Sequence, residues 1–369
     1  MLAAPRTAKP SRILVADDST FMRRLLTQAL RDAGFEVVGQ AADGDEALSL
    51  YRELRPDAMT LDLAMPGMDG IGVLRALRGE RASLPVVVVS AFSPAHGARA
   101  VDALAEGAFD LVAKPAMGEP LEQFVAALRE KVTAAATSSQ PPAAPAPAPT
   151  ARPAAGKTPR IGAEGSAVAR MRARRQAAGA AGADKVVLIA TSTGGPRALA
   201  ELIPDLPSPL GAGGMIVQHM PAGFTASLAQ RLDKSGRLSV VEAQGGEALR
   251  PDTLILAPGG SHLRVGPDGV ARLTEDAAIG GLRPRADLTI TDAAKLYGER
   301  LVLVVMTGMG KDGLEGAKAV RARGGRILVE AESTCTVYGM PRAIVEAGLA
   351  DEIVPLGELA DAIASEAGA

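Results

Sequence analysis

The chain has 369 residues with 40 basic and 42 acidic side chains, and 47% of its residues are hydrophobic. This length exceeds one ordinary hydrophobic core and predicts two domains, while the balanced charge favours neither nucleic acid nor an anionic membrane surface as a partner. The single cysteine, Cys335, excludes an internal disulfide framework and a multi-cysteine zinc cluster, and we expect it to be a small buried residue. We therefore look for function in local sites and expect no nucleic-acid partner.

The N-terminal segment MLAAPRTAKPSR lacks the apolar region of a secretory signal. Nowhere does the sequence approach the roughly 18 consecutive apolar residues that a membrane span requires. We expect a cytoplasmic protein with no direct membrane insertion.

In the first part of the chain, short apolar runs alternate with amphipathic stretches of helical length. Continuous Val, Ile and Leu runs are typical of strands that are buried on both faces, and right-handed crossovers join such strands into a parallel sheet. We predict a doubly wound α/β domain over residues 11–133, with five parallel strands at 13–16, 37–39, 58–61, 86–89 and 111–113.

Residues 134–184 contain Pro-Ala repeats and almost no large apolar side chains, as in ATSSQPPAAPAPAPTARPAAGKTPR. Such a composition does not form a core, so we predict a linker. Beyond it the alternation of apolar runs and helical stretches returns. We predict a second, Rossmann-like α/β domain over residues 185–366, with a mostly parallel sheet and strands at 186–190, 214–218, 254–257, 301–306 and 327–329.

Acidic and polar side chains follow the predicted strands of the first domain. Asp17 and Asp18 come after the first strand and Asp62 after the third. Ser90 ends the fourth strand, and Lys114 follows the fifth. Functional groups in open α/β sheets gather at the carboxyl ends of strands, so we expect these side chains to converge. Crowded carboxylates need a cation, and hard oxygen ligands favour Mg²⁺.

This convergence gives Asp62 a chemical role. A carboxylate beside bound Mg²⁺ can attack a phosphoryl donor, with Ser90 and Lys114 placed to contact the phosphoryl oxygens. Each feature also has a structural explanation, since an acid at a strand end often caps a helix and a Lys-Pro step often forms a turn. The occurrence of all of them at the expected strand ends favours the phosphoacceptor site.

Together with PDAMTLDLAMPGMDG around Asp62, this set resembles the receiver domain of two-component response regulators. The resemblance implies that Asp62 is the phosphoacceptor. It also implies that Asp18, Asp62 and the backbone carbonyl of Ala64 hold the metal, with help from Asp17.

Three further positions bear on this resemblance. It implies a cis peptide bond before Pro115, as in the family's Lys-Pro step. Leu111 stands where many receivers have an aromatic switch residue, and Ala64 is apolar two positions after the phosphoacceptor. We therefore expect the switching details and the phosphoryl lifetime to differ from those of many receivers.

A second set of polar residues follows strands of the second domain. Ser192 lies in TSTGGPRAL, a Gly-rich strand-to-helix turn whose backbone N–H groups suit an oxyanion or, equally, a bound phosphate. His219 directly follows the next strand, where it is placed as a general base, and Asp312 in TGMGKDG could orient the imidazole. A lone histidine at a strand end is more often structural, but this convergence favours a serine hydrolase.

The motifs ATSTGGP, QHMPAGFT, LAPGG, TGMGKDG and CTVYGMPRA resemble the catalytic domain of the CheB family of chemotaxis protein-glutamate methylesterases/protein-glutamine glutaminases, in which a receiver precedes the catalytic domain. The resemblance implies a triad of Ser192, His219 and Asp312. It places the backbone amides of Thr193 and Met309 in the oxyanion hole. It also implies hydrolysis of glutamyl methyl esters on methyl-accepting chemotaxis receptors, deamidation of specific receptor glutamines, and no cofactor in the esterase site.

The resemblance further implies that the unphosphorylated receiver blocks the hydrolase and that phosphorylation by the chemotaxis histidine kinase CheA relieves the block. One departure is LRPRAD at 282–287, which replaces a commoner arginine-proline-serine stretch. We expect His262 to be structural or to line the substrate. Two alternatives stay open: a signalling or binding module whose hydrolase domain serves a pathway other than chemotaxis, and a phosphate or nucleotide site at TSTGGP, which lacks the Lys-Ser/Thr ending of a P-loop.

Overall fold

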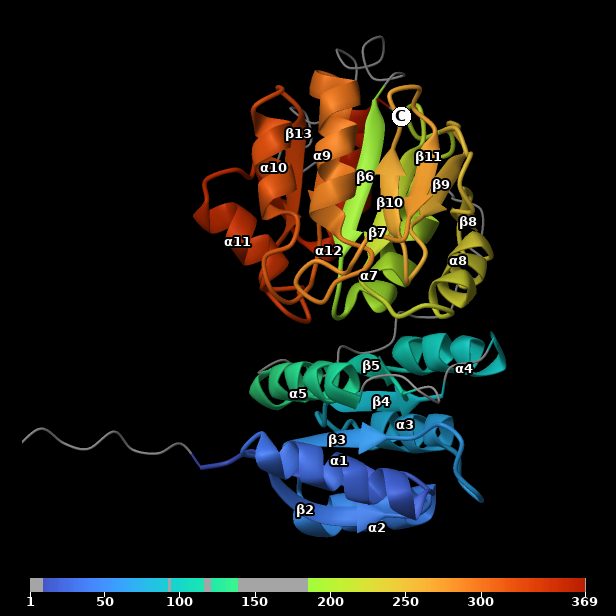
Figure 1. The fold of residues 1–369 in the computed structure, drawn as a ribbon, viewed down its shortest axis with the longest axis vertical. Helices are drawn as coiled ribbons and strands as arrows, with labels where there is room; N and C mark the ends of the chain where they lie inside the picture. Colours follow the sequence, from blue (N-terminus) through green and yellow to red (C-terminus); the bar gives the residue numbers. More distant parts are fainter. Residues whose placement is uncertain (1–8, 92–93, 116–120, 139–184, 369) are drawn as a thin grey trace, which may run out of the picture. The chain divides into compact units, whose positions relative to one another are not determined.

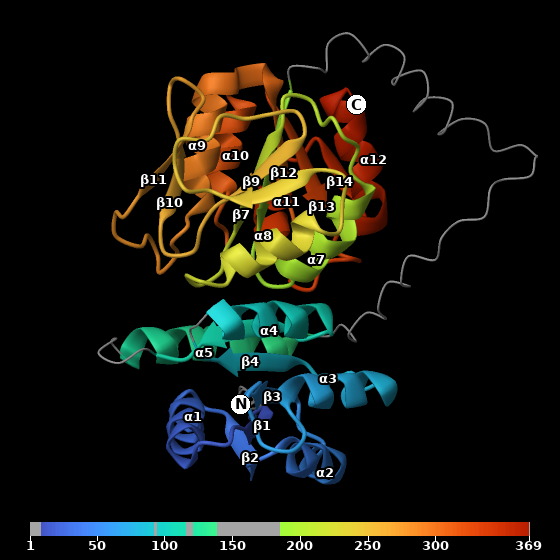
Figure 2. The same ribbon diagram turned by 90° about the vertical axis from the view of Figure 1, so that its right-hand side faces the viewer.

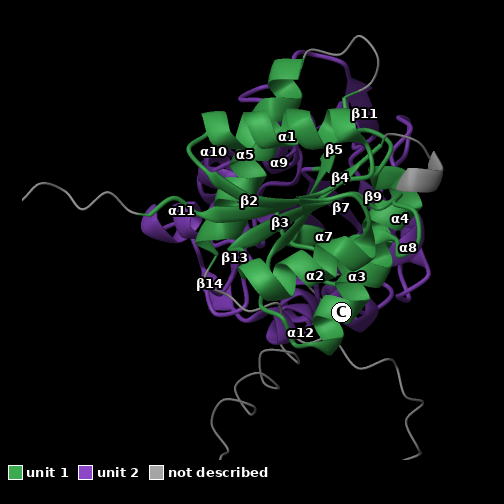
Figure 3. Cartoon of the chain, turned by 90° about the horizontal axis from the view of Figure 1, so that it is seen from below, with its two compact units in different colours: residues 1–143, 192–197, 220–228 green, residues 144–191, 198–219, 229–369 purple. Residues whose placement is uncertain are grey.

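The structure is a computed structural model that describes residues 9–91, 94–115, 121–138 and 185–368. The chain divides into two compact units, coloured separately in Figure 3: residues 1–143 with 192–197 and 220–228, and residues 144–191, 198–219 and 229–369. Most of the predicted linker, residues 139–184, lies outside the described residues. We describe the N-terminal and C-terminal sheets separately, with the helices that cover each.

The N-terminal sheet has five parallel strands in the order β2-β1-β3-β4-β5. Its strands are β1 (Arg12–Ala16), β2 (Glu36–Ala41), β3 (Ala58–Leu61), β4 (Val86–Ser90) and β5 (Asp110–Ala113). Every residue of β3 and β4 is buried, which is why these strands read as unbroken apolar runs. The predicted five-stranded, doubly wound sheet is confirmed.

Helices cover both faces of this sheet, as Figures 1 and 3 show. The helices are α1 (Thr20–Asp32), α2 (Gly44–Leu54), α3 (Gly70–Gly79), α4 (Pro94–Ala105) and α5 (Leu121–Thr137). Helices α1 and α5 lie on one face, and α2 and α3 lie on the other. Side chains fix where three helices begin, because Ser19, Asp43 and Asp69 each accept a hydrogen bond from a backbone N–H of the first turn.

The C-terminal sheet has seven parallel strands in the order β14-β13-β12-β6-β7-β9-β8. These are β6 (Val186–Thr191), β7 (Gly214–Gln218), β8 (Ser239–Glu242), β9 (Thr253–Leu256), β12 (Leu301–Val305), β13 (Arg326–Glu330) and β14 (Glu352–Val354). All five predicted strands are present. The two unpredicted strands, β8 and β14, are the short edge strands, and only one residue of each is fully buried.

An antiparallel hairpin of β10 (His262–Val265) and β11 (Ala271–Thr274) stands apart from this sheet. The helices are α7 (Gly195–Leu202), α8 (Thr225–Asp233), α9 (Ala286–Tyr297), α10 (Leu314–Arg321), α11 (Met340–Glu346) and α12 (Leu356–Ala367), with short 3₁₀ turns at Ile203–Asp205 and Gly298–Arg300. Figures 1 and 2 show α9, α10 and the hairpin on one side of the sheet and α7 and α12 on the other. The apolar core on the α9 side includes Leu188, Val217, Ile290, Leu303 and Val329.

In each parallel sheet the strand order reverses beside the first strand. In the first sheet, β2 lies on one side of β1 and β3 on the other; in the second, β7 lies on one side of β6 and β12 on the other. The loops that follow the two strands at such a point diverge and leave a crevice at the carboxyl edge. Both candidate sites lie there. Among the described residues, no helix is long and apolar enough to cross a membrane.

Candidate functional sites at the two sheet edges

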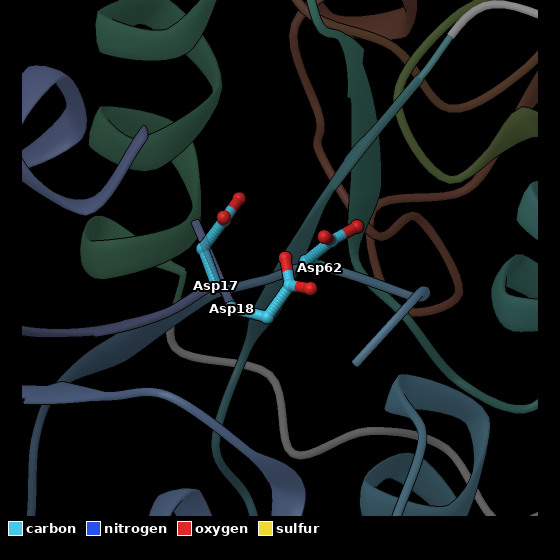
Figure 4. A group of neighbouring side chains, drawn as sticks. All are labelled: Asp17, Asp18 and Asp62. Atoms are coloured by element: carbon cyan, nitrogen blue, oxygen red, sulfur yellow. The ribbon is translucent and has the colours of Figure 1, made fainter. Parts of the chain in front are cut away.

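Three carboxylates come together at the edge of the N-terminal sheet. Asp17 and Asp18 directly follow β1, and Asp62 directly follows β3, the strand on the other side of the reversal. Figure 4 shows the three side chains gathered, and one carboxylate oxygen from each lies within 4.8 Å of the others. Asp17 and Asp62 are buried, whereas Asp18 is exposed. The predicted convergence of these acids is therefore observed.

Lys114 provides the positive charge of this cluster. It follows β5, and its Nζ lies 2.8 Å from Asp17 Oδ2 and 2.7 Å from Asp62 Oδ2. Burial raises the pKa of Asp17, and the hydrogen bond from Lys114 opposes this rise only in part. Burial lowers the pKa of Lys114, but its hydrogen bonds to Asp17 and Asp62 outweigh that effect and raise the pKa overall.

The cluster fits a divalent cation. Three carboxylates face one ammonium, so negative charge is left over, and hard oxygen donors are the ligands that Mg²⁺ prefers. Ser90 Oγ, at the end of β4, is buried and has no hydrogen-bond partner among the described residues. A phosphoryl oxygen would supply that partner. The Asp62 carboxylate also accepts from the amide of Ala64, at 3.3 Å.

One expectation for this site is wrong. Within the described residues the cis peptide bonds precede Pro209 and Pro284, and the bond before Pro115 is not among them. Leu111 lies in β5 and is 1% exposed, so the position of the aromatic switch residue is filled by a buried aliphatic side chain.

The second site lies at the edge of the C-terminal sheet. Strands β6 and β7 pair in a register that sets Thr191 opposite Gln218, so Ser192 and His219 directly follow two paired residues. The His219 amide donates to the Thr191 carbonyl at 3.1 Å, which continues the pairing by one step. After Ser192 the chain turns sharply: the Gly195 amide donates to the Ser192 carbonyl at 2.8 Å, and Gly194 has φ +80°, which favours glycine.

His219 and Asp312 form a close pair. His219 Nε2 lies 2.7 Å from Asp312 Oδ2, and both side chains are buried. An ionised carboxylate only accepts, so Nε2 carries the hydrogen of the neutral imidazole. The lone pair is then on Nδ1, which is buried and has no hydrogen-bond partner among the described residues. Nδ1 is therefore the nitrogen that can receive a proton.

Asp312 is held by backbone donors at the start of α9. Its Oδ2 accepts from the amide of Ala286 at 2.7 Å, and its Oδ1 accepts from the amides of Asp287 at 3.0 Å and Gly313 at 2.9 Å. Burial raises the pKa of Asp312, but the hydrogen bond and charge of His219 and the helix amides outweigh burial and lower the pKa strongly. Asp312 is therefore a fixed, ionised carboxylate.

The loop after β12 is anchored on both sides. Thr191 Oγ1 donates to the Thr307 carbonyl at 2.8 Å, which ties the loop to the end of β6. The Gly308 amide donates to the Val337 carbonyl, and the Gly308 carbonyl accepts from the Met340 amide at 2.8 Å. Met309, the proposed oxyanion residue, is carried on this anchored loop.

Sequence reasoning missed Arg285. Its guanidinium Nε forms an ion pair with Asp312 Oδ1 at 2.9 Å. The signal that could have found Arg285 is its position directly before α9, whose first turn lies beside Asp312. His262 is buried, and its Nδ1 accepts from the Arg285 amide at 3.1 Å. Cys335 is buried, as predicted.

The acidic cluster at the reversal point of the first sheet is typical of a receiver domain. The serine, histidine and aspartate that follow strands at the matching edge of the second sheet are typical of a hydrolase. The response regulator receiver domain model matches residues 13–126, and the CheB methylesterase model matches residues 187–363. The chain belongs to the CheB family of protein-glutamate methylesterases/protein-glutamine glutaminases.

Relatives match along almost the entire chain. A protein-glutamate methylesterase/protein-glutamine glutaminase of Symbiobacterium thermophilum is 42% identical, over 98% of this chain and 99% of that protein. A protein of Myxococcus xanthus with the same description is 44% identical, over 94% and 95%. The crystal structure of the Thermotoga maritima CheB methylesterase catalytic domain is 42% identical and covers 48% of this chain and 96% of that chain, with a TM-score of 0.47.

Proposed function

We propose that this chain is a phosphorylation-activated methylesterase that hydrolyses γ-glutamyl methyl esters on methyl-accepting chemotaxis receptors. The observation that carries the proposal is the buried pair of His219 and Asp312 at the sheet edge. Ser192 follows β6 and His219 follows β7 at the same step of the strand pairing. The receptor segments and the kinase that donates the phosphoryl group are cytoplasmic in this family, so we place the chain in the cytoplasm.

The hydrolase reaction is acyl transfer through a covalent intermediate. Ser192 Oγ attacks the ester carbonyl carbon while His219 Nδ1 takes its proton, and Asp312 stabilises the imidazolium. The backbone amides of Thr193 and Met309 donate to the oxyanion. Methanol leaves with the proton from His219, and a water that His219 deprotonates then releases glutamate and frees the serine.

The same steps hydrolyse a receptor glutamine, with ammonia as the leaving group in place of methanol. In both reactions the imidazolium of His219 protonates the leaving group, and in deamidation that group is more basic. We propose this deamidation as a second activity of the Ser192, His219 and Asp312 triad, which needs no cofactor.

In the receiver, Asp62 accepts the phosphoryl group from a histidine kinase of the CheA type. Mg²⁺, when bound, would neutralise charge on the transferred group. Asp18, Asp62 and the Ala64 carbonyl would hold the metal, with help from Asp17. Lys114 now bonds to Asp62 Oδ2 and exchanges that bond for a phosphoryl oxygen. Ser90 Oγ, which has no partner among the described residues, supplies a second contact.

Phosphorylation controls the hydrolase by changing the equilibrium between two receiver conformations. A modification shifts such an equilibrium only through contacts that differ between the two states. We propose that the unphosphorylated receiver, within the predicted domain 11–133, restricts substrate access to the catalytic domain at 185–366 and that phosphorylation releases this restriction. The predicted linker, 134–184, connects the two domains, and its residues 134–137 form the end of α5.

Methanol release from methylated receptor tests the activity. We expect the native chain to release methanol and Ser192→Ala to lose at least about 10⁴-fold in rate, because the nucleophile is gone. Ser239→Ala is the matched control, since Ser239 is an exposed serine of the same domain at the start of β8. Equal rates for the native chain and Ser192→Ala contradict the esterase assignment.

A further inference from the structure

Arg285 links the catalytic acid to a second buried carboxylate. It directly precedes α9, and its side chain is 20% exposed. Its Nε lies 2.9 Å from Asp312 Oδ1, its Nη2 lies 2.9 Å from Asp287 Oδ2, and its Nη1 donates to the Ile279 carbonyl at 3.2 Å. One guanidinium therefore contacts the orienting acid of the triad, a neighbouring acid and the loop before α9.

We propose that Arg285 is a positioning residue for ester hydrolysis, which balances the charge of Asp287 so that Asp312 acts on His219 as a single carboxylate. This inference rests on the proposed function of the Ser192, His219 and Asp312 triad. Within the described part of the chain, the ion pairs of Arg285 are with Asp287 and Asp312. Arg285 therefore acts on His219 through Asp312.

Asp287 is the group that makes a cation necessary. Its side chain is 12% exposed, its Oδ1 accepts from the Gly316 amide of α10 at 2.8 Å, and its Oδ2 contacts Arg285. Burial raises the pKa of Asp287, and the charge of Asp312 raises it further. Two carboxylates in this setting repel each other unless a cation lies between them.

The charged and titratable groups around Asp312 come from several elements. His219 follows β7, and Arg285 and Asp287 come from the start of α9. Lys311 directly precedes Asp312 in sequence and is exposed. His262 of β10 accepts from the backbone amide of Arg285. With Arg285 present, the two acids and one guanidinium leave a single negative charge for the imidazolium to balance.

Loss of the guanidinium changes the charge more than the geometry of Asp312. The amides of Ala286, Asp287 and Gly313 still donate to Asp312, so its orientation is held without Arg285. The negative charge facing His219 increases, which stabilises the protonated ring and moves the loss of its proton to higher pH. An effect of charge is visible in pH dependence, whereas a purely structural effect is not.

The test compares Arg285→Met with the native full-length chain. We expect the low-pH limb of kcat/KM for methanol release to move up by about one pH unit, with a loss of about tenfold on that limb. The pH at which the His219 ring signals move in the NMR spectrum should rise in parallel. His219→Gln assigns those signals, since the chain has only 3 histidines.

Two further variants separate charge from structure. Arg285→Met with Asp287→Asn removes one charge of each sign, so we expect the limb and the ring signals to return toward the native pH. Arg264→Met is the matched control: Arg264 pairs with Asp292 of α9 at 2.6 and 3.0 Å, and its loss removes a similar ion pair from the same helix. We expect Arg264→Met to shift neither the pH limb nor the His219 ring signals.

The proposal is overturned if Arg285→Met lowers kcat/KM by the same factor at every pH while the His219 signals titrate as in the native chain. It is also overturned if the double variant keeps the full shift of Arg285→Met. The ring signals are measured without substrate, so they test Arg285 even if the native chain releases no methanol. That last result would contradict the proposed function alone.

Discussion

The two sheet edges place polar side chains at equivalent points of the fold but balance charge in different ways. In the receiver, Asp17 and Asp62 share the ammonium of Lys114, and Asp18 lies beside them. Ser90 Oγ has no partner among the described residues. In the hydrolase, Asp312 alone has three backbone amides, an imidazole and a guanidinium as partners. The first site needs an external cation, and the second does not need one to hold its acid in the charged form.

This difference corresponds to two kinds of function. A site that is unbalanced until a cation and a phosphoryl group bind can change its preferred conformation when they do. A catalytic site gains from donors that are already in place before the reaction, because no reorganisation is needed as charge develops. The receiver edge is therefore suited to receiving a signal, and the edge with His219 and Asp312 is suited to catalysis.

The largest expected effect is at the edge with His219 and Asp312. We expect Asp312→Asn to lower kcat for methanol release about 10⁴-fold, because the amide no longer holds His219 in the tautomer with its lone pair on Nδ1. Asp292→Asn, which alters the ion pair between Arg264 and α9, is the control and should leave kcat within a few-fold of native. A loss below tenfold for Asp312→Asn contradicts the orienting role.

A chelator should affect the receiver site and not the hydrolase site. We expect removal of Mg²⁺ to slow phosphorylation of Asp62 by at least about a hundredfold, since the metal neutralises the transferred group, and to leave unphosphorylated esterase turnover unchanged. Intact-mass measurement follows the phosphoryl group. Asp18→Asn should behave like the chelator, with Asp45→Asn, an exposed acid at the start of α2, as its control. Chelator-sensitive basal turnover would place a metal in the esterase site.

The same substitution should change stability in opposite directions at the two edges. The raised pKa of Asp17 means that ionisation opposes folding, so its penalty is absent below pH about 4 and grows as the pH rises through the folded-state pKa. The lowered pKa of Asp312 means the reverse: its stabilisation is present at neutral pH and is lost as the pH falls.

Without Mg²⁺ at pH 7, we therefore expect Asp17→Asn to stabilise the first sheet by about 1 kcal/mol and Asp312→Asn to destabilise the second by about 1–3 kcal/mol. Hydrogen exchange in urea, read separately on β1 and β6, measures both. An Asp17→Asn variant that is less stable than the native chain under these conditions shows that the cluster is not short of positive charge.

The smallest expected effect concerns the loop that carries Met309. Thr191→Val keeps the side chain's shape and removes its hydrogen bond to the Thr307 carbonyl. We expect a stability loss of about 1 kcal/mol and a few-fold lower kcat with little change in KM. Thr253→Val, which loses a bond from an exposed setting, is the control. A native kcat for Thr191→Val means that this bond does not position the loop.

Much of this architecture follows from local sequence. The buried central strands, such as Val86–Ser90 and Leu301–Val305, are almost entirely apolar, so burial on both faces is visible in the sequence. The edge strand Ser239–Glu242 alternates in burial and is short, and the hairpin at 262–274 lies outside the main sheet, so neither gives the same pattern. Strand ends then predict which residues gather at each edge.

Side-chain partners are less visible. Arg285 and Asp312 are far apart in sequence and meet because α9 packs beside the loop after β12, which no local pattern encodes. The ring nitrogen of His219 that faces Asp312 is likewise set by packing. The strand pattern therefore predicts the acids of the first edge and the pair of His219 and Asp312 at the second. The contacts that tune these groups required the structure.

We propose that phosphorylation of Asp62 controls chemistry at Ser192. Methanol release from methylated receptor, with and without a small phosphodonor and Mg²⁺, tests it directly when the native chain is compared with Asp62→Asn. We expect the native rate to rise roughly 5- to 150-fold, the usual range of coupling between two sites, and the rate of Asp62→Asn not to respond. A native chain that is phosphorylated on Asp62 without any change in rate, or an Asp62→Asn chain that responds equally, contradicts the account.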